Sequence, residues 1–89
     1  MNVKPARKHS SIVLAQETVR FGGMLLDYRL VASTSETDRF QIQISTGAEQ
    51  AESGAGSDIE AALRAYRAVL RGRVTPCGLA DVMYDLKSV

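Results

Sequence analysis

The sequence contains one cysteine and one histidine in 89 residues. A single cysteine cannot close a disulfide within the chain, and a structural zinc site needs about four cysteine or histidine ligands. A low cysteine content is typical of proteins from reducing compartments. We therefore expect a cytoplasmic protein with no disulfide, no bound metal and no other cofactor.

Long apolar runs and a strong charge of either sign are also missing. The longest uninterrupted apolar run covers residues 12–15, which is far too short for a membrane span or for the core of a signal peptide. The formal net charge is +1, so the overall field favours neither nucleic acid nor an acidic partner. Apolar residues make up 45% of the chain, as in ordinary globular proteins. We therefore predict a globular protein that does not enter a membrane.

The chain is short for a domain that must be stable by itself. A domain of this size buries only about 60–65% of the surface of its unfolded chain. Without disulfides or a metal, a partner chain is the remaining common source of stability. Residues 1–10 are polar and basic without periodicity, which predicts a disordered tail. Residues 11–89 are predicted to form one small domain.

Residues 11–33 predict two strands joined by a tight turn at Gly22-Gly23, because glycine tolerates the positive φ that two-residue hairpin turns need. The turn determines which residues face each other, and the resulting register makes one face of the hairpin mostly apolar and the other mostly polar. The predicted pairs are Phe21–Met24, Val19–Leu26, Ala15–Leu30 and Val13–Ala32 on the apolar face, with Leu14–Val31 on the other.

Apolar and polar side chains alternate over residues 39–46, which predicts a half-buried third strand. Phe40, Ile42 and Ile44 are expected to face the core. Residues 47–56 are mostly small and are predicted to form a loop.

Two helices are predicted in the last third of the chain. Ser57 and Glu60 have the spacing of a capping box at the start of the first helix, and Gly72 suits a left-handed C′ position at its end. Thr75 and Pro76 suit the N-cap and first residue of the second helix. The apolar positions that follow the spacing of one helix face are Ile59, Ala62, Leu63, Tyr66, Val69 and Leu70 in the first helix, and the predicted buried stripe of the second helix is Leu79, Val82, Met83 and Leu86.

The predicted fold is α+β, a three-stranded antiparallel β-meander with two C-terminal helices packed on one face, in the order β-β-β-α-α. The segments DYRL (27–30), FQIQI (40–44) and DIE (58–60), followed by V-T-P-x-x-L-x-D-V-x-x-D-L (74–86), resemble a family of small uncharacterised proteins from Firmicutes, a domain of unknown function. Where those relatives carry Tyr-Gly-Ile in the third strand, this chain has residues 39–42 as Arg-Phe-Gln-Ile. The resemblance implies a shared fold and supplies no activity.

Cys77 is predicted to lie at the start of the second helix, where the helix dipole favours a thiolate. A catalytic thiol also needs a base nearby, but the only histidine, His9, lies in the predicted tail. We therefore interpret Cys77 as a small structural residue, with a reactive thiol as the alternative.

Two further segments resemble ligand sites. Residues 54–58 place glycines before a helix, where phosphates can bind, but Asp58 and Glu60 already supply negative charge there and no P-loop lysine follows. Asp81 and Asp85 are four residues apart on the second helix, yet two carboxylates alone do not make a cation site. We interpret these segments as a flexible loop with a cap and as a solvated helix face.

Glu17 is predicted to lie on the apolar face of the hairpin, opposite Tyr28. A buried carboxylate is costly and is often functional. The interpretation that we favour places Glu17 at the open edge of the first strand, where it reaches water or an arginine.

Arg64, Arg67 and Arg71 share one face of the first helix, and Arg73 follows just beyond it. Together with the basic tail they could contact phosphates. The alternative is a solvated helix face, partly neutralised by Glu60. No exposed aromatic series for base stacking is predicted.

Ile12, Leu14, Leu25 and Val31 fall on the otherwise polar face of the hairpin. An exposed apolar patch on a small domain often marks an interface, although surface scatter or cover by the tail would also explain it. The sequence therefore favours a non-enzymatic protein-interaction or regulatory module that associates with itself or another protein, most simply as a homodimer. A nucleic-acid-binding module that uses the arginine face and the tail is the alternative.

Overall fold

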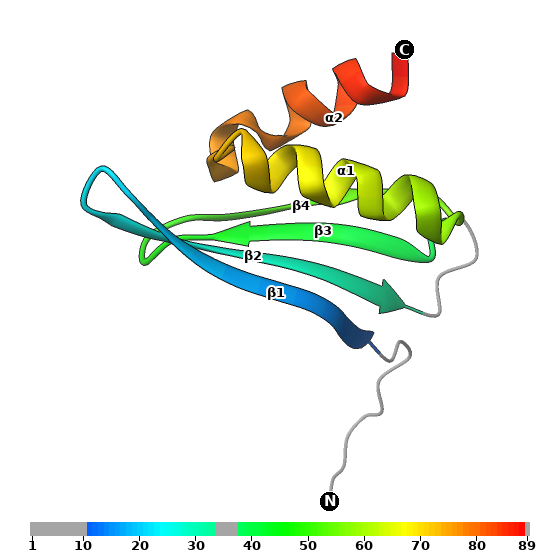
Figure 1. Ribbon diagram of the computed structural model, residues 1–89, viewed down its shortest axis with the longest axis horizontal. Helices are drawn as coiled ribbons and strands as arrows, with labels where there is room; N and C mark the ends of the chain where they lie inside the picture. The colour runs from blue at the N-terminus through cyan, green and yellow to red at the C-terminus, as the bar shows by residue number, and fades with distance from the viewer. Residues whose placement is uncertain (1–10, 34–37, 89) are drawn as a thin grey trace, which may run out of the picture.

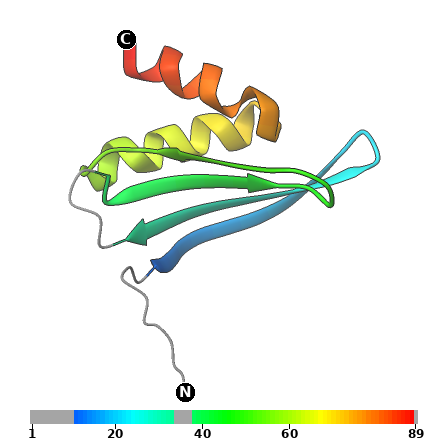
Figure 2. The ribbon, with the colours of Figure 1, turned by 180° about the vertical axis from the view of Figure 1, so that it is seen from behind.

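The computed structural model describes residues 11–33 and 38–88, with the side chains of residues 87 and 88 excepted (Figure 1). The predicted tail, residues 1–10, lies outside the described residues. The strands form one antiparallel sheet in the order β1-β2-β3-β4, with both helices on one face (Figures 1 and 2). This confirms the α+β class and the C-terminal helix pair. The elements are β1 (Ser11–Phe21), β2 (Met24–Ser33), β3 (Phe40–Ser45), β4 (Gln50–Gly54), α1 (Ile59–Arg71), η1 (Pro76–Gly78) and α2 (Leu79–Ser88).

The sheet has four strands, so the prediction of a three-stranded meander with a loop over residues 47–56 was wrong. β4 pairs with β3 along its whole length. The turn between them is closed by Thr46, whose hydroxyl accepts hydrogen bonds from the N–H groups of Ala48 (3.2 Å) and Glu49 (3.1 Å). Small and polar side chains in β4 give no apolar alternation in the sequence, but the free edge of β3 can pair with any backbone of suitable length.

The hairpin of β1 and β2 has the predicted turn. Gly22 and Gly23 have φ values of 58° and 85°, as a type I′ turn requires, and the predicted pairs nearest the turn are all present. The predicted pairs Leu14–Val31 and Val13–Ala32 were wrong, because β1 has a bulge at Leu14, so that Val13 faces Val31 and Ile12 faces Ala32 instead. A bulge adds one residue to one strand only, and an alternation pattern does not reveal it.

The core lies between the sheet and the two helices. α1 packs over β2 and β3, whereas η1 and α2 pack over β4. β1 lies to the side of both helices (Figure 1). The buried side chains that form the core are Leu26, Tyr28, Leu30, Ile42 and Ile44 from the sheet, Ala55 from the loop before α1, and Ala62, Tyr66, Val69, Leu79 and Met83 from the helices.

α1 begins one residue later than the capping box predicts. The N-cap is Asp58, whose carboxylate accepts a hydrogen bond of 3.2 Å from the backbone N–H of Ala61. Aspartate and serine are equally good N-caps, so sequence preference alone does not choose between Asp58 and Ser57.

α1 ends in a Schellman motif. The N–H of Arg73 donates to the carbonyl of Leu70 (3.1 Å), and the N–H of Val74 donates to that of Val69 (3.2 Å). The left-handed residue of this motif is Arg73, with φ of 49°, whereas Gly72 has φ of −80°. The prediction for Gly72 was wrong because α1 continues to Arg71, so the left-handed position falls one residue later.

The second helical segment starts at Pro76, as predicted, with the 3-10 turn η1 and then α2. Thr75 occupies the N-cap position, but its side chain makes no capping hydrogen bond. Leu79 and Met83 are buried, Val82 is half-buried, and Leu86 is 38% exposed. The predicted stripe is therefore buried most deeply near the start of α2, because α2 diverges from α1 towards its C-terminus (Figures 1 and 2).

Candidate interaction surface

The most exposed element of secondary structure is β1. Nine of its eleven residues are exposed, and Ala15 and Val19 are half-buried. Among the residues that the structure describes, no strand lies on the outer side of β1, and the helices pack mainly over other strands. The alternation in the sequence predicts that the apolar face of this strand contributes to the core, whereas in the structure only Ala15 and Val19 of β1 pack against it.

The outer edge of β1 presents unpaired backbone groups in a regular pattern. Residues that flank a two-residue turn form a hydrogen-bonded pair, and such pairs alternate with non-hydrogen-bonded pairs along an antiparallel ladder. The pair Phe21–Met24 is hydrogen-bonded. Every second residue from there, namely Val19, Glu17 and Ala15, therefore also bonds to β2. The N–H and C=O groups of the residues between them therefore point outwards, and these residues are Gln16, Thr18 and Arg20.

The opposite edge of the sheet is less open. β4 has five residues, and η1 and α2 pack against it. Short or covered edge strands do not favour pairing with another chain, whereas long uncovered ones do. The two edges therefore differ, and β1 is the edge that can accept a further strand.

The predicted apolar patch is not a single surface. Ile12, Leu14 and Leu25 are exposed, at 65%, 46% and 54%, but Val31 is only 3% exposed. Including Val31 in an interface was wrong, since its pairs with β1 and β3 leave it covered. Leu25 pairs with Arg20 near the turn, and Ile12 lies at the far end of β1. The bulge at Leu14 shifts the register by one residue, so Ile12 pairs with Ala32 and lies on the opposite face of the sheet from Leu25.

Polar residues on the same face of the sheet as Leu25 form a cluster around Asp27. Its carboxylate accepts hydrogen bonds from the Gln16 amide (3.2 Å) and the Thr18 hydroxyl (3.3 Å), and it forms an ion pair with Arg29 (3.1 Å). A depression of about 300 Å³ on the sheet lies next to Asp27 and Arg29 and is also lined by Gln43. The ion pair neutralises Asp27 and Arg29, although the buried Nε of Arg29 has no hydrogen-bond partner among the described residues, and the bonds from Gln16 and Thr18 hold β1 against β2.

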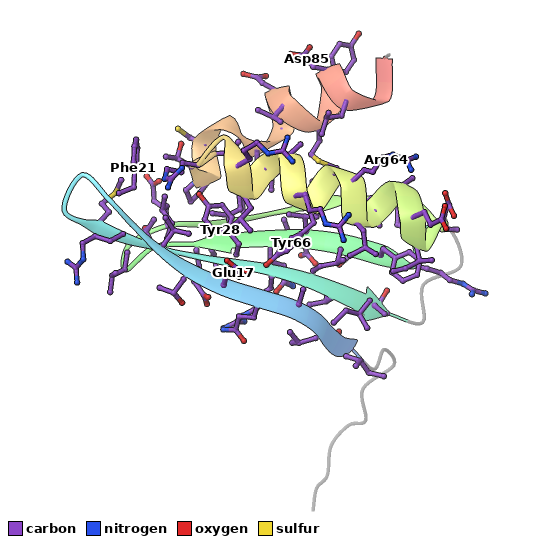
Figure 3. All side chains as sticks on the ribbon, in the orientation of Figure 1. Glu17, Phe21, Tyr28, Arg64, Tyr66 and Asp85 are labelled. Carbon is purple, nitrogen blue, oxygen red and sulfur yellow. The ribbon has the colours of Figure 1, made fainter. Side chains whose placement is uncertain are left out.

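Glu17 lies at the edge of the sheet, on the side where Tyr28 and Tyr66 are found (Figure 3). It is exposed and pairs with Tyr28 across the ladder, as predicted. The Tyr66 hydroxyl donates to the Tyr28 carbonyl (3.4 Å), and the Tyr28 hydroxyl donates to the Val74 carbonyl (3.0 Å). Burial raises the pKa of Tyr66, and the negative charge of Glu17 raises it further. The tyrosines tie α1 and the segment before η1 to the sheet.

The arginine face of α1 is exposed as predicted. Arg64, Arg67 and Arg71 are all exposed, and so is Arg73 after the helix. Arg64 points away from the sheet (Figure 3). Asp81 and Asp85 are exposed on α2. The exposed surface of the two helices therefore has charges of both signs.

The remaining candidates do not form a site within the described residues. Cys77 is exposed, and its sulfur lies 3.8 Å from the Thr75 hydroxyl. Asp58 itself occupies the N-terminus of α1, where the sequence allows a phosphate. Among residues 11–33 and 38–88, no three histidine, cysteine, aspartate or glutamate side chains gather as metal ligands would.

Comparison with known proteins adds no relative: no family model, no curated protein and no solved structure matches this chain. The resemblance to the Firmicutes family therefore stays a prediction. Neither described helix has the length and apolar character needed to cross a membrane.

Proposed function

We propose that this protein is a small, non-enzymatic interaction module that self-associates through the outer edge of β1. The observation that carries the proposal is an eleven-residue edge strand with nine exposed residues, against which neither described helix packs extensively. Exposed strands of this length are the usual site at which one chain adds a strand to the sheet of another.

The energetics of β1 support a partner at this edge. Ordering a residue costs about 1–2 kcal/mol of backbone entropy, which burial and hydrogen bonding must offset. β1 buries little of its own surface, and the tip of its hairpin projects beyond the helices with Phe21 and Met24 exposed at 44% and 41% (Figure 1). A second copy along this edge would pair the free backbone groups and cover part of these side chains.

Sedimentation equilibrium over a range of micromolar concentrations tests the proposal. We expect a reversible dimer for the natural chain and a monomer for Thr18→Pro. Proline removes an outward N–H and puts a ring in the path of a partner strand, and it removes no backbone hydrogen bond to β2, only the bond from the Thr18 hydroxyl to Asp27. A natural chain that stays monomeric at the highest concentration would refute self-association.

Two measurements separate loss of the interface from loss of the fold. Circular dichroism should show the same secondary structure for Thr18→Pro as for the natural chain. Amide hydrogen exchange of the natural chain needs no variant: the N–H groups of Gln16, Thr18 and Arg20 should become protected as the protein concentration rises. Concentration-independent exchange at these three amides would contradict the proposal even if the variant unfolds.

Binding of nucleic acid is the second candidate, and the exposure of Arg64, Arg67 and Arg71 along α1 favours it. Phosphate contacts of this kind weaken steeply with salt. Fluorescence anisotropy with single- and double-stranded oligonucleotides at about 50 mM salt should then show binding that Arg64→Glu and Arg67→Glu reduce. Absence of binding under these conditions would eliminate this candidate.

A further inference from the structure

We infer that two copies pair antiparallel along β1 about a two-fold axis that passes beside Thr18, so that two four-stranded sheets become one continuous sheet. This inference rests on the proposed self-association and adds its geometry. The axis runs perpendicular to the sheet, and the helices of both copies therefore lie on the same face. The two copies would pair through the regular part of β1, from Ala15 to Phe21.

The backbone pattern favours an axis at Thr18. The outward-pointing residues are Gln16, Thr18 and Arg20, and Thr18 is the middle one. An axis there places Thr18 opposite its own copy and Gln16 opposite the partner's Arg20, so every outward residue enters a hydrogen-bonded pair. An axis at Glu17 sets Gln16 opposite Thr18 but leaves Arg20 without an outward-pointing residue opposite it. An axis at Val19 sets Thr18 opposite Arg20 and leaves Gln16 in the same position.

Charge excludes two of the alternative axes. An axis at Glu17 would set two carboxylates directly opposite each other, and an axis at Arg20 would do the same with two guanidinium groups. Like charges directly opposite across strands are destabilising. The axis at Thr18 instead places Glu17 opposite Val19 and Arg20 opposite Gln16, so no like charges face each other directly.

The two ends of the regular segment also fit against each other in this arrangement. The bulge at Leu14 closes the segment on one side, and the turn at Gly22 closes it on the other. With the axis at Thr18, Ala15 faces Phe21 of the second copy, which places a small side chain opposite a large one. Phe21 is 44% exposed in the single chain, and this contact would cover part of it.

The helices do not obstruct this arrangement. α1 lies over β2 and β3, about two strand spacings from the axis. The two copies of α1 would therefore be roughly 20 Å apart, well beyond the 8–10 Å of packed helices. The pairing leaves a trough on the helix side, with the Glu17 and Val19 side chains of both copies on its floor.

Single-cysteine crosslinking in a Cys77→Ser background tests the axis. Thr18→Cys should form an interchain disulfide on mild oxidation, because hydrogen-bonded partners have Cα atoms about 5.5 Å apart, within the range of a disulfide. Gln16→Cys and Arg20→Cys alone should not, since each lies about 14 Å from its own copy. An equal mixture of these two variants should crosslink, because residue 16 then faces residue 20.

The matched control is Gln50→Cys, an exposed position on the opposite edge strand, which should remain uncrosslinked. Each variant is first checked by sedimentation under reducing conditions. A dimer in which Thr18→Cys does not crosslink, or in which Gln16→Cys alone does, would overturn the axis and leave self-association standing. A monomeric natural chain would instead refute self-association itself, and the inference with it.

Discussion

Arg73 adopts the left-handed backbone conformation in the Schellman motif that ends α1. A side chain in this region costs roughly 1–2 kcal/mol, which glycine does not incur. Glycine loses about 0.5–1 kcal/mol of that advantage because its unfolded chain is more flexible. We therefore expect Arg73→Gly to raise the free energy of unfolding by about 0.75 kcal/mol, the difference between the middle values of these two ranges. For a domain of this size, this corresponds to a Tm increase of about 3–6 °C.

Thermal unfolding followed by far-ultraviolet circular dichroism measures this effect. The matched control is Arg71→Gly, which removes the same side chain at the last residue of α1, where the backbone is helical. Glycine is unfavourable in a helix by about 0.5–1 kcal/mol, so this variant should unfold at a lower temperature than the natural chain. A fall in Tm for Arg73→Gly comparable to that of Arg71→Gly would refute the role given to the left-handed conformation.

Two further predictions concern the other parts of the fold. Gly54→Ala should destabilise the protein by about 1 kcal/mol in chemical unfolding, because its Cβ would lie 2.5 Å from the carboxyl of Asp38, which would have to move away from the Gly56 N–H that donates to it at 3.0 Å. Gly47→Ala, where nothing lies within 4 Å of the added atom, is the control, and an equal effect of both would contradict this reason. Burial raises the pKa of Tyr66 in the folded chain above its usual value near 10, so its contribution to stability is present below about pH 10 and is lost as the pH rises through the folded pKa. The free energy of unfolding should therefore fall at alkaline pH, and less steeply in Tyr66→Phe; an unchanged pH profile in this variant would show that Tyr66 contributes nothing.

The self-association predicted from the sequence stays a prediction, but the structure changes the residues proposed for it. The patch of Ile12, Leu14, Leu25 and Val31 depends on side chains that share one face of the hairpin. The structure buries Val31, places Leu14 at a bulge, and separates Leu25 from Ile12 along the strand. The outward residues Gln16, Thr18 and Arg20 are polar, so the apolar pattern of the sequence does not point to them. The predicted meander already makes β1 an edge strand, but only the structure shows that the described part of the chain leaves its outer side uncovered.

Local sequence determines the hairpin, the third strand and both helices. Gly22 and Gly23 specify a type I′ turn, and the register of the first several pairs follows from that turn alone. The alternation of Phe40, Ile42 and Ile44 and the helical spacing of Ala62, Tyr66 and Val69 place these side chains towards one core. Each of these signals is contained within a few residues, so no knowledge of the remaining chain is needed to read it.

Tertiary structure alone decides the features that matter for a partner. β4 forms because its backbone pairs with the free edge of β3. The register of residues 11–13 is shifted by one residue because Leu14 forms a bulge in β1. Arg73 takes a strained conformation because α1 ends one residue later than the position of Gly72 suggests. The helices cover three strands and leave β1 uncovered, since their positions depend on packing against β2, β3 and β4 rather than on any residue of β1.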